Sequence, residues 1–451
     1  MFKKIAICLF LAAGCLGAGA AATNSLTWHR NTDHVDADLR GEPLLPLLEQ
    51  IAKQAGWHVF IEPATTHSTS VKFKDLPSGD ALKRLLGDLN FALVPQTNAV
   101  PRLYVFRTVL KNATQPVLAP KAPARYVTNE LLVKIKPGAD IDALARSLGA
   151  NITGRNDKLG LYRLLFDNAE AADAALAKLK NNSDVEAADY NYYFDPPTAP
   201  QRIENAPVGP VSLTLDPVAT DDACNAVVGL IDTRVRSLGS QLDSFLLKNL
   251  SVAGDAGTNA SGLTHGTAMA QTILRAVAQA AGGSSSVRVV AVDVYGADAT
   301  TTSWNVALGI KAAVDNGATV INLSLGGSGD STILDNVIQQ AIAAGIPVYA
   351  AAGNQPVTTP TYPAAAPGVI SVTALQTAGQ LAPYANHGSW VDLALPGASV
   401  VYSGGQAYVI QGTSPATAYA TGMAAGTKGV NCVPWTQIQS AMQQKFAVPT
   451  K

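Results

Sequence analysis

The amino-acid sequence predicts an α/β protein with a doubly wound, mostly parallel sheet in its C-terminal half and two smaller α+β domains before it. From about residue 220, short apolar runs such as "AVVGLID" and "TVINLSLGG" lack in/out alternation, which is typical of strands covered on both faces. Helical stretches separate these runs, and that alternation favours a parallel sheet. Two earlier stretches, 33–110 and 127–195, each combine two helical patterns with several strands.

Length and composition agree with several domains. The chain has 451 residues, of which 47% are hydrophobic and 14% charged, so sizeable cores can be buried. The formal net charge is -1 and no long basic run occurs. Nucleic acid or an anionic membrane is therefore disfavoured as the main partner.

The first 22 residues have the pattern of an export signal. Lys3 and Lys4 precede an apolar segment too short to span a bilayer comfortably, and small residues follow as far as Ala22. The prediction is an exported protein, periplasmic or secreted. An uncleaved anchor and lipidation at Cys15, in "LAAGC", are the alternatives. No later segment has a transmembrane pattern.

Residues 33–110 predict a small α+β domain. One helix is bounded by Pro43 and Gly56, and its apolar stripe consists of Leu44, Leu48, Ile51 and Ala55. The phrase "LRGEPLLPLLEQIAKQAGWHVFIEP" resembles the short N-terminal domain shared by secretins and TonB-dependent receptors. That resemblance implies a bacterial envelope setting and an envelope protein as the domain's partner.

Residues 127–195 predict a βαββαβ order, which suits a ferredoxin-like sandwich. A proline-rich linker, 196–219, follows. This domain resembles the N-terminal pro-domain of subtilisin-like proteases. The resemblance implies a folding template and an intramolecular inhibitor. Because "YNYYF" is aromatic and extended and stands just before the linker, we expect the domain to dock on the catalytic domain, 220–447, with this segment near the active site.

Four polar residues stand at element ends in the C-terminal half. Asp232 ends a strand, His265 opens a helix, Asn354 follows "IPVYAAAG", and Ser414 opens the helix of "SPATAYATGMAAG". Taken singly, each has a structural explanation as a cap or a turn residue. Pro415 suits the first turn of a helix, whose free N–H groups could serve an oxyanion beside Ser414.

Together the four follow the Asp, His, Ser order of one serine-protease arrangement, with Asn354 between His and Ser. The words "VVGLIDT", "THGTAMA", "VINLSLGG", "AAAGN" and "GTSPATAYATGMAAG" resemble the subtilisin-like serine peptidase family, in the same order. The resemblance extends over essentially the whole C-terminal half and implies a subtilisin-like fold.

The resemblance also implies roles. Ser414 would attack the peptide carbonyl, His265 would carry the proton, Asp232 would orient the imidazole, and Asn354 would donate to the oxyanion. Substrate would pair as an added strand with Ser324, Leu325 and Gly326. The substrate side chain before the cleaved bond would lie against Ala351, Ala352 and Gly353.

Two positions depart from the family pattern. Arg234 stands where a glycine is usual, and Ala418 where a proline is usual. Neither change removes a reacting group, but both bear on local backbone geometry. No cofactor is required for this chemistry and no metal ligands are assigned. The family's calcium-binding loops are not recognised in this sequence, so the sequence gives no support for structural calcium.

Beyond the signal, only two cysteines occur, Cys224 and Cys432. An exported setting allows a disulfide between them, and two separate buried thiols are the alternative.

The sequence thus predicts an exported serine endopeptidase made as a zymogen, acting on polypeptides. The main alternative is an envelope binding or signalling protein with a dormant protease fold. A hydrolase of another acyl bond is disfavoured by the segments "SLGG" and "AAAGN", to which the family resemblance assigns peptide binding.

Overall fold

The structure, a computed structural model, describes residues 24–449 except 31, 64, 97–98, 114, 118–123, 196, 205–212, 214, 220–223, 240, 255–262 and 377–378. The predicted signal and Cys15 lie outside the described residues. The chain forms two compact units, Met1–Pro120 and Lys121–Lys451. Among the described residues, no helix has the length and apolarity to cross a membrane.

The first unit has two small sheets around one apolar core. The order of the first is β1-β2-β4 and that of the second β5-β6-β3-β7. Of the predicted stripe on the first helix, Leu44, Leu48 and Ile51 are buried and Ala55 is partly buried, while Leu47, which was not predicted, is fully buried. The elements are β1 (Ser25–His29), β2 (His34–Pro43), α1 (Leu44–Ala55), β3 (His58–Ile61), β4 (Ser68–Pro77), α2 (Ser78–Leu86), β5 (Asn90–Gln96), β6 (Ala99–Phe106) and β7 (Gln115–Val117).

The 127–195 domain begins the second unit and has the expected βαββαβ order. Its strands lie in the order β11-β8-β10-β9, with both helices on one face. The elements are β8 (Tyr126–Ile135), α3 (Ile141–Leu148), β9 (Asn151–Asn156), β10 (Leu161–Leu165), α4 (Ala169–Leu179) and β11 (Val185–Phe194).

The C-terminal domain contains a seven-stranded parallel sheet in the order β15-β17-β14-β19-β20-β21-β22. The α/β prediction is therefore confirmed. The strands are β14 (Val227–Asp232), β15 (Leu246–Ser251), β17 (Arg288–Asp293), β19 (Val320–Leu323), β20 (Val348–Ala351), β21 (Ile370–Leu375) and β22 (Leu393–Pro396). Every residue of β14, β19 and β20 is buried, which explains the missing alternation.

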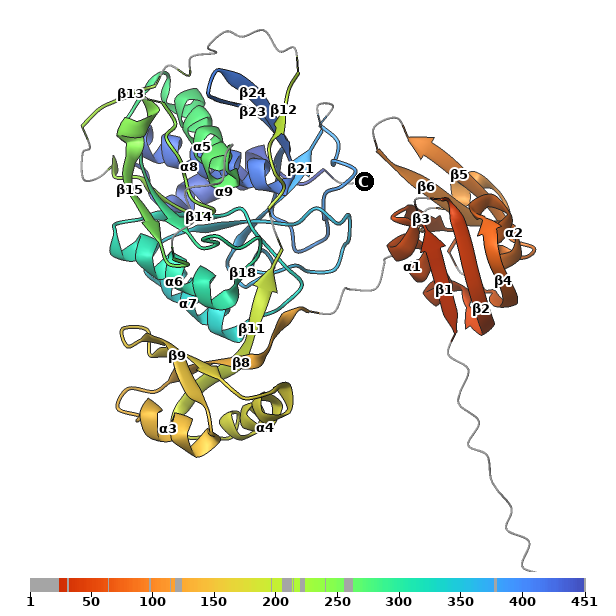
Figure 1. Cartoon of the computed structure of the whole chain (residues 1–451). Coiled ribbons are helices and arrows are strands. Elements are labelled where there is room, and N and C mark those ends of the chain that lie inside the picture. The colour runs from red at the N-terminus through yellow and green to blue at the C-terminus, as the bar shows by residue number, and fades with distance from the viewer. Residues whose placement is uncertain are drawn as a thin grey trace, which may run out of the picture. The chain divides into compact units, whose positions relative to one another are not determined.

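Helices cover both faces of this sheet (Figure 1). One core joins the sheet to α5 (His265–Ala281), α8 (Thr413–Asn431) and α9 (Trp435–Lys445). The other joins it to α6 (Ser303–Asp315) and α7 (Thr332–Ala343), and includes Leu132, Leu161 and Phe194 of the 127–195 domain. The second core therefore continues across the boundary between the two domains.

Short strands extend this boundary. The end of β11 pairs with β18 (Thr301–Thr302). Part of the predicted linker forms β12 (Gln201–Arg202), which pairs with β24 (Gln406–Gln411) of the hairpin that begins with β23 (Ala398–Ser403). A further short pair joins β13 (Asp216–Pro217) to β16 (Ser284–Ser285). Composition alone did not predict that the linker would contribute a strand.

Cys224 and Cys432 form a disulfide that closes a sequence separation of 208 residues. It joins the start of the C-terminal domain to the residue that follows and caps the C-terminal end of α8. Of the two alternatives, a disulfide or two separate buried thiols, the structure contains the disulfide.

Candidate active site

Asp232 and His265 form a buried pair. The Nδ1 atom of His265 lies 2.8 and 2.9 Å from the two carboxylate oxygens of Asp232, and both side chains are only 2% exposed. The Thr233 N–H also donates to Asp232 Oδ1, at 2.7 Å. The other ring nitrogen, Nε2, is buried and has no hydrogen-bond partner. The carboxylate therefore orients the ring and leaves Nε2 free to exchange a proton.

Gly266 allows this close approach of α5 to β14. A Cβ at this position would lie 2.0 Å from the Thr233 carbonyl oxygen. The Gly266 N–H donates to Thr233 Oγ1 at 2.8 Å, and Thr264 caps the helix by accepting from Thr267 N. The small residue after His265 is thus a packing requirement, since any side chain would push the helix away from Asp232.

The packing of α5 on α8 brings Ser414 level with His265. A Cβ at Gly422 would lie 2.4 Å from the Ile273 carbonyl oxygen, and one at Gly426 would lie 3.1 Å from that of Val277. Both pairs have the same separation in the sequence as Ser414 and His265. The helices therefore run parallel, and both begin at the same end of the pair.

The Ser414 hydroxyl points to a carbonyl in this structure. Its Oγ donates to the Ser324 carbonyl oxygen at 3.1 Å, and the Ser324 hydroxyl donates back to the Ser414 carbonyl oxygen at 3.1 Å. Asn322 holds Ser324 Oγ and accepts from Thr421 Oγ1. The start of α8 is thus tied to the end of β19, while the expected Ser414–His265 hydrogen bond is not formed.

Asn354 is held by the residue before Ser414. Its Oδ1 accepts from the Thr413 N–H at 2.8 Å and from the Thr413 hydroxyl at 3.1 Å. A Cβ at Gly412 would lie 3.0 Å from Asn354 Nδ2. The oxygen of the Asn354 amide is thus engaged by the residue that opens α8, and its Nδ2 lies beside Gly412.

The two segments predicted to bind substrate are neighbours. A Cβ at Gly326 would lie 3.6 Å from the Ala351 carbonyl oxygen, and Ala352 is fully buried. The chain's own Tyr193 and Phe194 lie against the first segment, because a Cβ at Gly327 would be 3.1 Å from the Tyr193 carbonyl oxygen.

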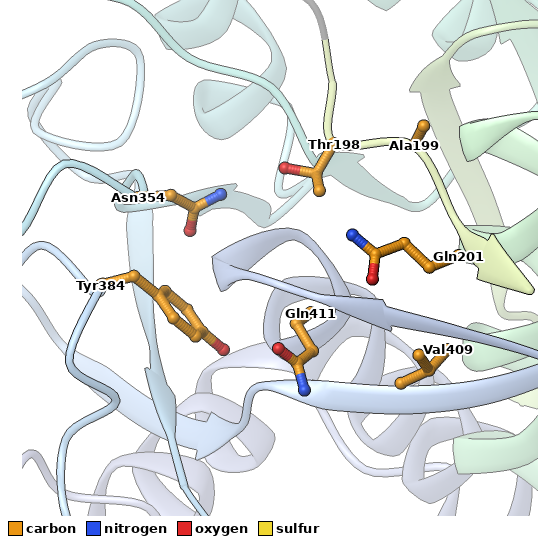
Figure 2. Close-up of a pocket in the computed structure, with 7 residues that line it drawn as sticks. All are labelled: Thr198, Ala199, Gln201, Asn354, Tyr384, Val409 and Gln411. Atoms are coloured by element: carbon orange, nitrogen blue, oxygen red, sulfur yellow. The ribbon is translucent and has the colours of Figure 1, made fainter. Parts of the chain in front are cut away.

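A pocket of about 240 Å³ lies between the linker and the C-terminal domain (Figure 2). Its lining includes Asn354, and residues from the linker and from β24 face one another across it. The full lining is Thr198, Ala199, Gln201, Asn354, Tyr384, Val409 and Gln411. Phe194 packs beside Gly327, and Thr198 lines the same pocket as Asn354.

A second buried acid adjoins Asp232. Asp293 is its register partner on the neighbouring strand and is 1% exposed. Its Oδ1 accepts from the N–H groups of Tyr295 and Gly296, while its Oδ2 has no partner. Burial and then the charge of Asp232 raise the pKa of Asp293, whereas its two backbone hydrogen bonds lower it.

Sequence reasoning missed several supporting residues. Asn386, which is fully buried, donates to the Ala352 carbonyl oxygen at 2.8 Å and accepts from Gln355 N, so it holds the loop that carries Asn354. Thr233 and Thr413 orient Asp232 and Asn354. The sequence offered only weak signals for them, namely their positions beside predicted site residues or in "YANHG".

The two departures are accommodated. The Arg234 side chain is exposed, and its carbonyl oxygen accepts from Thr264 Oγ1 at 2.7 Å. Ala418 is fully buried within α8. In the described part of the chain, no three His, Cys, Asp or Glu residues gather as a set of metal ligands.

Comparison with known proteins identifies the class. The subtilase family matches residues 224–447, and the fervidolysin N-terminal prodomain matches 112–191. A thermophilic serine proteinase of Bacillus sp. (strain AK1) is 30% identical over 335 residues, which are 71% of this chain and 82% of that protein. Subtilisin E of Bacillus subtilis (strain 168) is 38% identical over 175 residues, 36% of this chain and 45% of that protein.

The chain therefore belongs to the subtilase family of serine endopeptidases and carries a prodomain matched over residues 112–191, which include most of the 127–195 domain. Among solved structures, fervidolysin from Fervidobacterium pennivorans, described as a keratinolytic enzyme related to subtilisin, aligns with a TM-score of 0.52. The alignment has 18% identity and covers 71% of this chain and 57% of that one, so it shows the shared fold.

Proposed function

We propose that this chain is an exported endopeptidase that hydrolyses peptide bonds with Ser414, His265 and Asp232, and that it is made as an inactive precursor. The observation that carries the proposal is the buried Asp232–His265 pair, whose Nε2 has no hydrogen-bond partner, together with the parallel packing of α5 on α8.

In the proposed reaction, the Ser414 hydroxyl turns from the Ser324 carbonyl toward His265 Nε2. Its oxygen bonds to the peptide carbonyl carbon as Nε2 takes the proton, and Asp232 stabilises the resulting imidazolium. Asn354 and the Ser414 N–H donate to the oxyanion. His265 then protonates the leaving nitrogen as the C–N bond breaks. Water hydrolyses the acyl ester by the same steps in reverse order.

The precursor proposal is supported by the route of the linker. Phe194 is buried in the core shared with the C-terminal domain, and Thr198 lines the pocket beside Asn354. The same strip of surface cannot hold this segment and a substrate together. Cleavage between 195 and 224 and departure of the prodomain would therefore precede activity.

A fluorophosphonate probe tests the proposal, because it reacts with an activated serine hydroxyl. The processed wild type is expected to become labelled at Ser414, and Ser414→Ala to remain unlabelled. Ser440→Ala, which changes an exposed serine of α9, is the matched control and keeps the label. Absence of labelling in processed wild type at every pH from 5 to 10 contradicts an active enzyme.

A dormant protease fold is the second candidate, and one observation favours it. Ser414 Oγ is bonded to the Ser324 carbonyl oxygen, and His265 Nε2 has no partner. If removal of the prodomain leaves this arrangement in place, neither labelling nor peptide hydrolysis will appear.

A further inference from the structure

The linker that follows the prodomain adds a strand to the C-terminal domain. β12 lies antiparallel to β24, with Gln201 opposite Val409. The Ile203 N–H extends the pairing by donating to the Ala407 carbonyl oxygen at 2.9 Å. Both side chains of β12 are exposed, so the backbone makes this contact. Residues 201–203, which we call the β12 segment, are therefore held in a way that depends little on their side chains.

The β12 segment lies next to the proposed active site. Just before it, Thr198 and Ala199 line the pocket whose other walls include Asn354 and Gln411 (Figure 2). β24 ends at Gln411, and only Gly412 separates it from α8, which carries Ser414. The edge of β24 that β12 occupies is thus an extension of the site.

The chain makes its contacts in a definite order. Phe194 comes first, and a Cβ at Gly327, directly after the segment predicted to pair with substrate, would lie 3.6 Å from its ring. Thr198, beside Asn354, comes next, and the β12 segment follows on β24. A substrate bound in the same direction would place the residues after its cleaved bond on β24. We call this part of the site the leaving side.

The two ends of the linker are held by different domains. Asp195 forms an ion pair with Arg125 of the prodomain, at 3.2 Å. Beyond β12, Leu215 is fully buried in the core that contains α5 and α8. The Val218 N–H donates to the Ser285 carbonyl oxygen at 3.1 Å, beside the short β13–β16 pair. From β12 onward, the linker is therefore attached to the C-terminal domain.

We propose that the β12 segment stays on β24 after the prodomain is cut away, and that it keeps the leaving side occupied until a substrate displaces it or a second cut removes it. The inference rests on the proposed function, since it concerns the same site. The first cut falls near Thr198, the linker residue beside Asn354. Water adds across the peptide bond, which leaves a carboxylate on the prodomain and an amine on the retained chain.

The tether explains why the segment stays. After the first cut, the β12 segment is still joined through a short stretch of chain to the buried Leu215. A strand tethered in this way competes at an effective concentration on the order of millimolar. Its pairing is made by the backbone, so an extended polypeptide of another sequence can take its place. The free edge of β24 is thus a binding strand for extended polypeptides.

The test compares two processed forms of the C-terminal domain. The first comes from the full chain with a specific protease site inserted directly after Asp195, and it keeps the β12 segment. The second has the site within 205–212 and loses the segment together with the prodomain. In both cases the prodomain is removed by size-exclusion chromatography at the lowest urea concentration that separates the fragments.

Hydrogen exchange followed by mass spectrometry shows whether the segment stays. In the Ser414→Ala background, amides of β24 (Gln406–Gln411) should exchange more slowly in the form that keeps the segment. Amides of α9 (Trp435–Lys445) are the internal control and should exchange alike in both forms. Equal exchange of β24 in the two forms overturns the proposal, and this readout needs no catalysis.

Kinetics in the active background show whether the segment occupies the leaving side. Two substrates share the residues before the cleaved bond. One ends there in a chromogenic amide, and the other continues for six residues. The ratio of kcat/KM for the long substrate to that for the amide should be about tenfold lower in the form that keeps the segment. Equal ratios in the two forms overturn the proposal.

Two proline variants of the form that keeps the segment identify the contact. Ile203→Pro removes the N–H that donates to Ala407, so exchange of β24 should become faster and hydrolysis of the long substrate should recover. Glu204→Pro, at the next, exposed residue, is the matched control, because a proline there favours an extended residue 203. It should keep the slow exchange and the low ratio. No effect of Ile203→Pro on either readout overturns the assignment to β12.

Failure of the proposed function is distinguishable from failure of this inference. If neither processed form reacts with the fluorophosphonate or cleaves either substrate, the endopeptidase proposal is wrong. The exchange of β24 in the Ser414→Ala background still decides whether the β12 segment remains in place.

Discussion

The helices on the two faces of the central sheet differ in which side chains accept hydrogen bonds from the N–H groups of their first turns. On one face, α5 begins with His265 and α8 with Thr413, and N–H groups of their first turns are paired within the C-terminal domain by Thr264 and Asn354. On the other face, α6 and α7 begin against the prodomain. There, Asn191 accepts from the Trp304 N–H at 3.1 Å, and Asp189 accepts from the Thr332 N–H.

The difference separates the helix starts that carry the proposed catalytic residues from those that bind the prodomain. A helix start offers unpaired donors wherever it occurs. On the first face, the domain satisfies them itself, and the geometry needed for catalysis does not depend on the prodomain. On the second face, two of them are satisfied by side chains that leave with the prodomain. The four predictions below test this division, from the largest expected effect to the smallest.

Asp232→Asn should lower kcat by about 10⁴-fold, because a neutral amide neither holds the required tautomer of His265 nor stabilises its charged form. Steady-state kinetics on a peptide substrate measure the effect. Docking of the prodomain should be unchanged. It is measured by size-exclusion chromatography of the nicked precursor, which is the Ser414→Ala chain cut by a specific protease at a site inserted within 205–212. Loss of docking in this variant would show that the two faces are not independent.

Asn354→Asp should lower kcat by about 10² to 10³-fold, since it removes the N–H donors that face the oxyanion. It keeps an oxygen for the Thr413 N–H, so the melting temperature should stay close to that of wild type. Asn354→Leu removes both functions and should lower activity and melting temperature together. Equal melting temperatures for the two variants would contradict the bond to Thr413 as a support of α8.

Replacing Cys224 and Cys432 by serine should reduce the free energy of unfolding by about 2–4 kcal/mol, because the disulfide closes a long loop. Denaturant unfolding in the Ser414→Ala background measures the loss. In the active background, kcat should be retained at low temperature, because Cys432 lies at the opposite end of α8 from Ser414. A large fall in kcat without a change in stability would count against a purely structural tether.

Asn191→Ala should weaken docking by about 1 kcal/mol, roughly fivefold, through loss of the acceptor for the Trp304 N–H. The nicked precursor again reports the change. The processed enzyme should have wild-type kcat, since residue 191 is no longer attached. Asn151→Ala, at an exposed position on β9, is the control and should leave docking unaltered. A drop in kcat of processed Asn191→Ala enzyme would refute the separation of the two faces.

Much of the fold follows from local pattern. The strand that ends at Asp232, the helix that follows Gly412 and the βαββαβ order of the prodomain are all present where the sequence predicts them. Apolar runs and helical stripes report burial directly, because burial is what the period of the element imposes on side chains. The order of Asp232, His265, Asn354 and Ser414 likewise requires only the sequence.

The remaining features depend on contacts between distant segments. The pairing of the linker with β24, of β11 with β18, and of Asp189 with α7 each involves one or two residues with no periodic signal. The direction of the Ser414 hydroxyl also depends on a distant segment, because its side-chain rotamer is set by the hydrogen bond to the Ser324 carbonyl oxygen.

By itself, the sequence determined which residues are buried, where strands and helices lie, and which side chains stand at their ends. Only the tertiary structure decided which of those ends meet: Asp232 with His265 on one face, and Asp189 with the Thr332 N–H at the start of α7 on the other. The physical reason is that burial is encoded residue by residue, whereas a hydrogen bond between segments far apart in the chain exists only once both are folded and packed together.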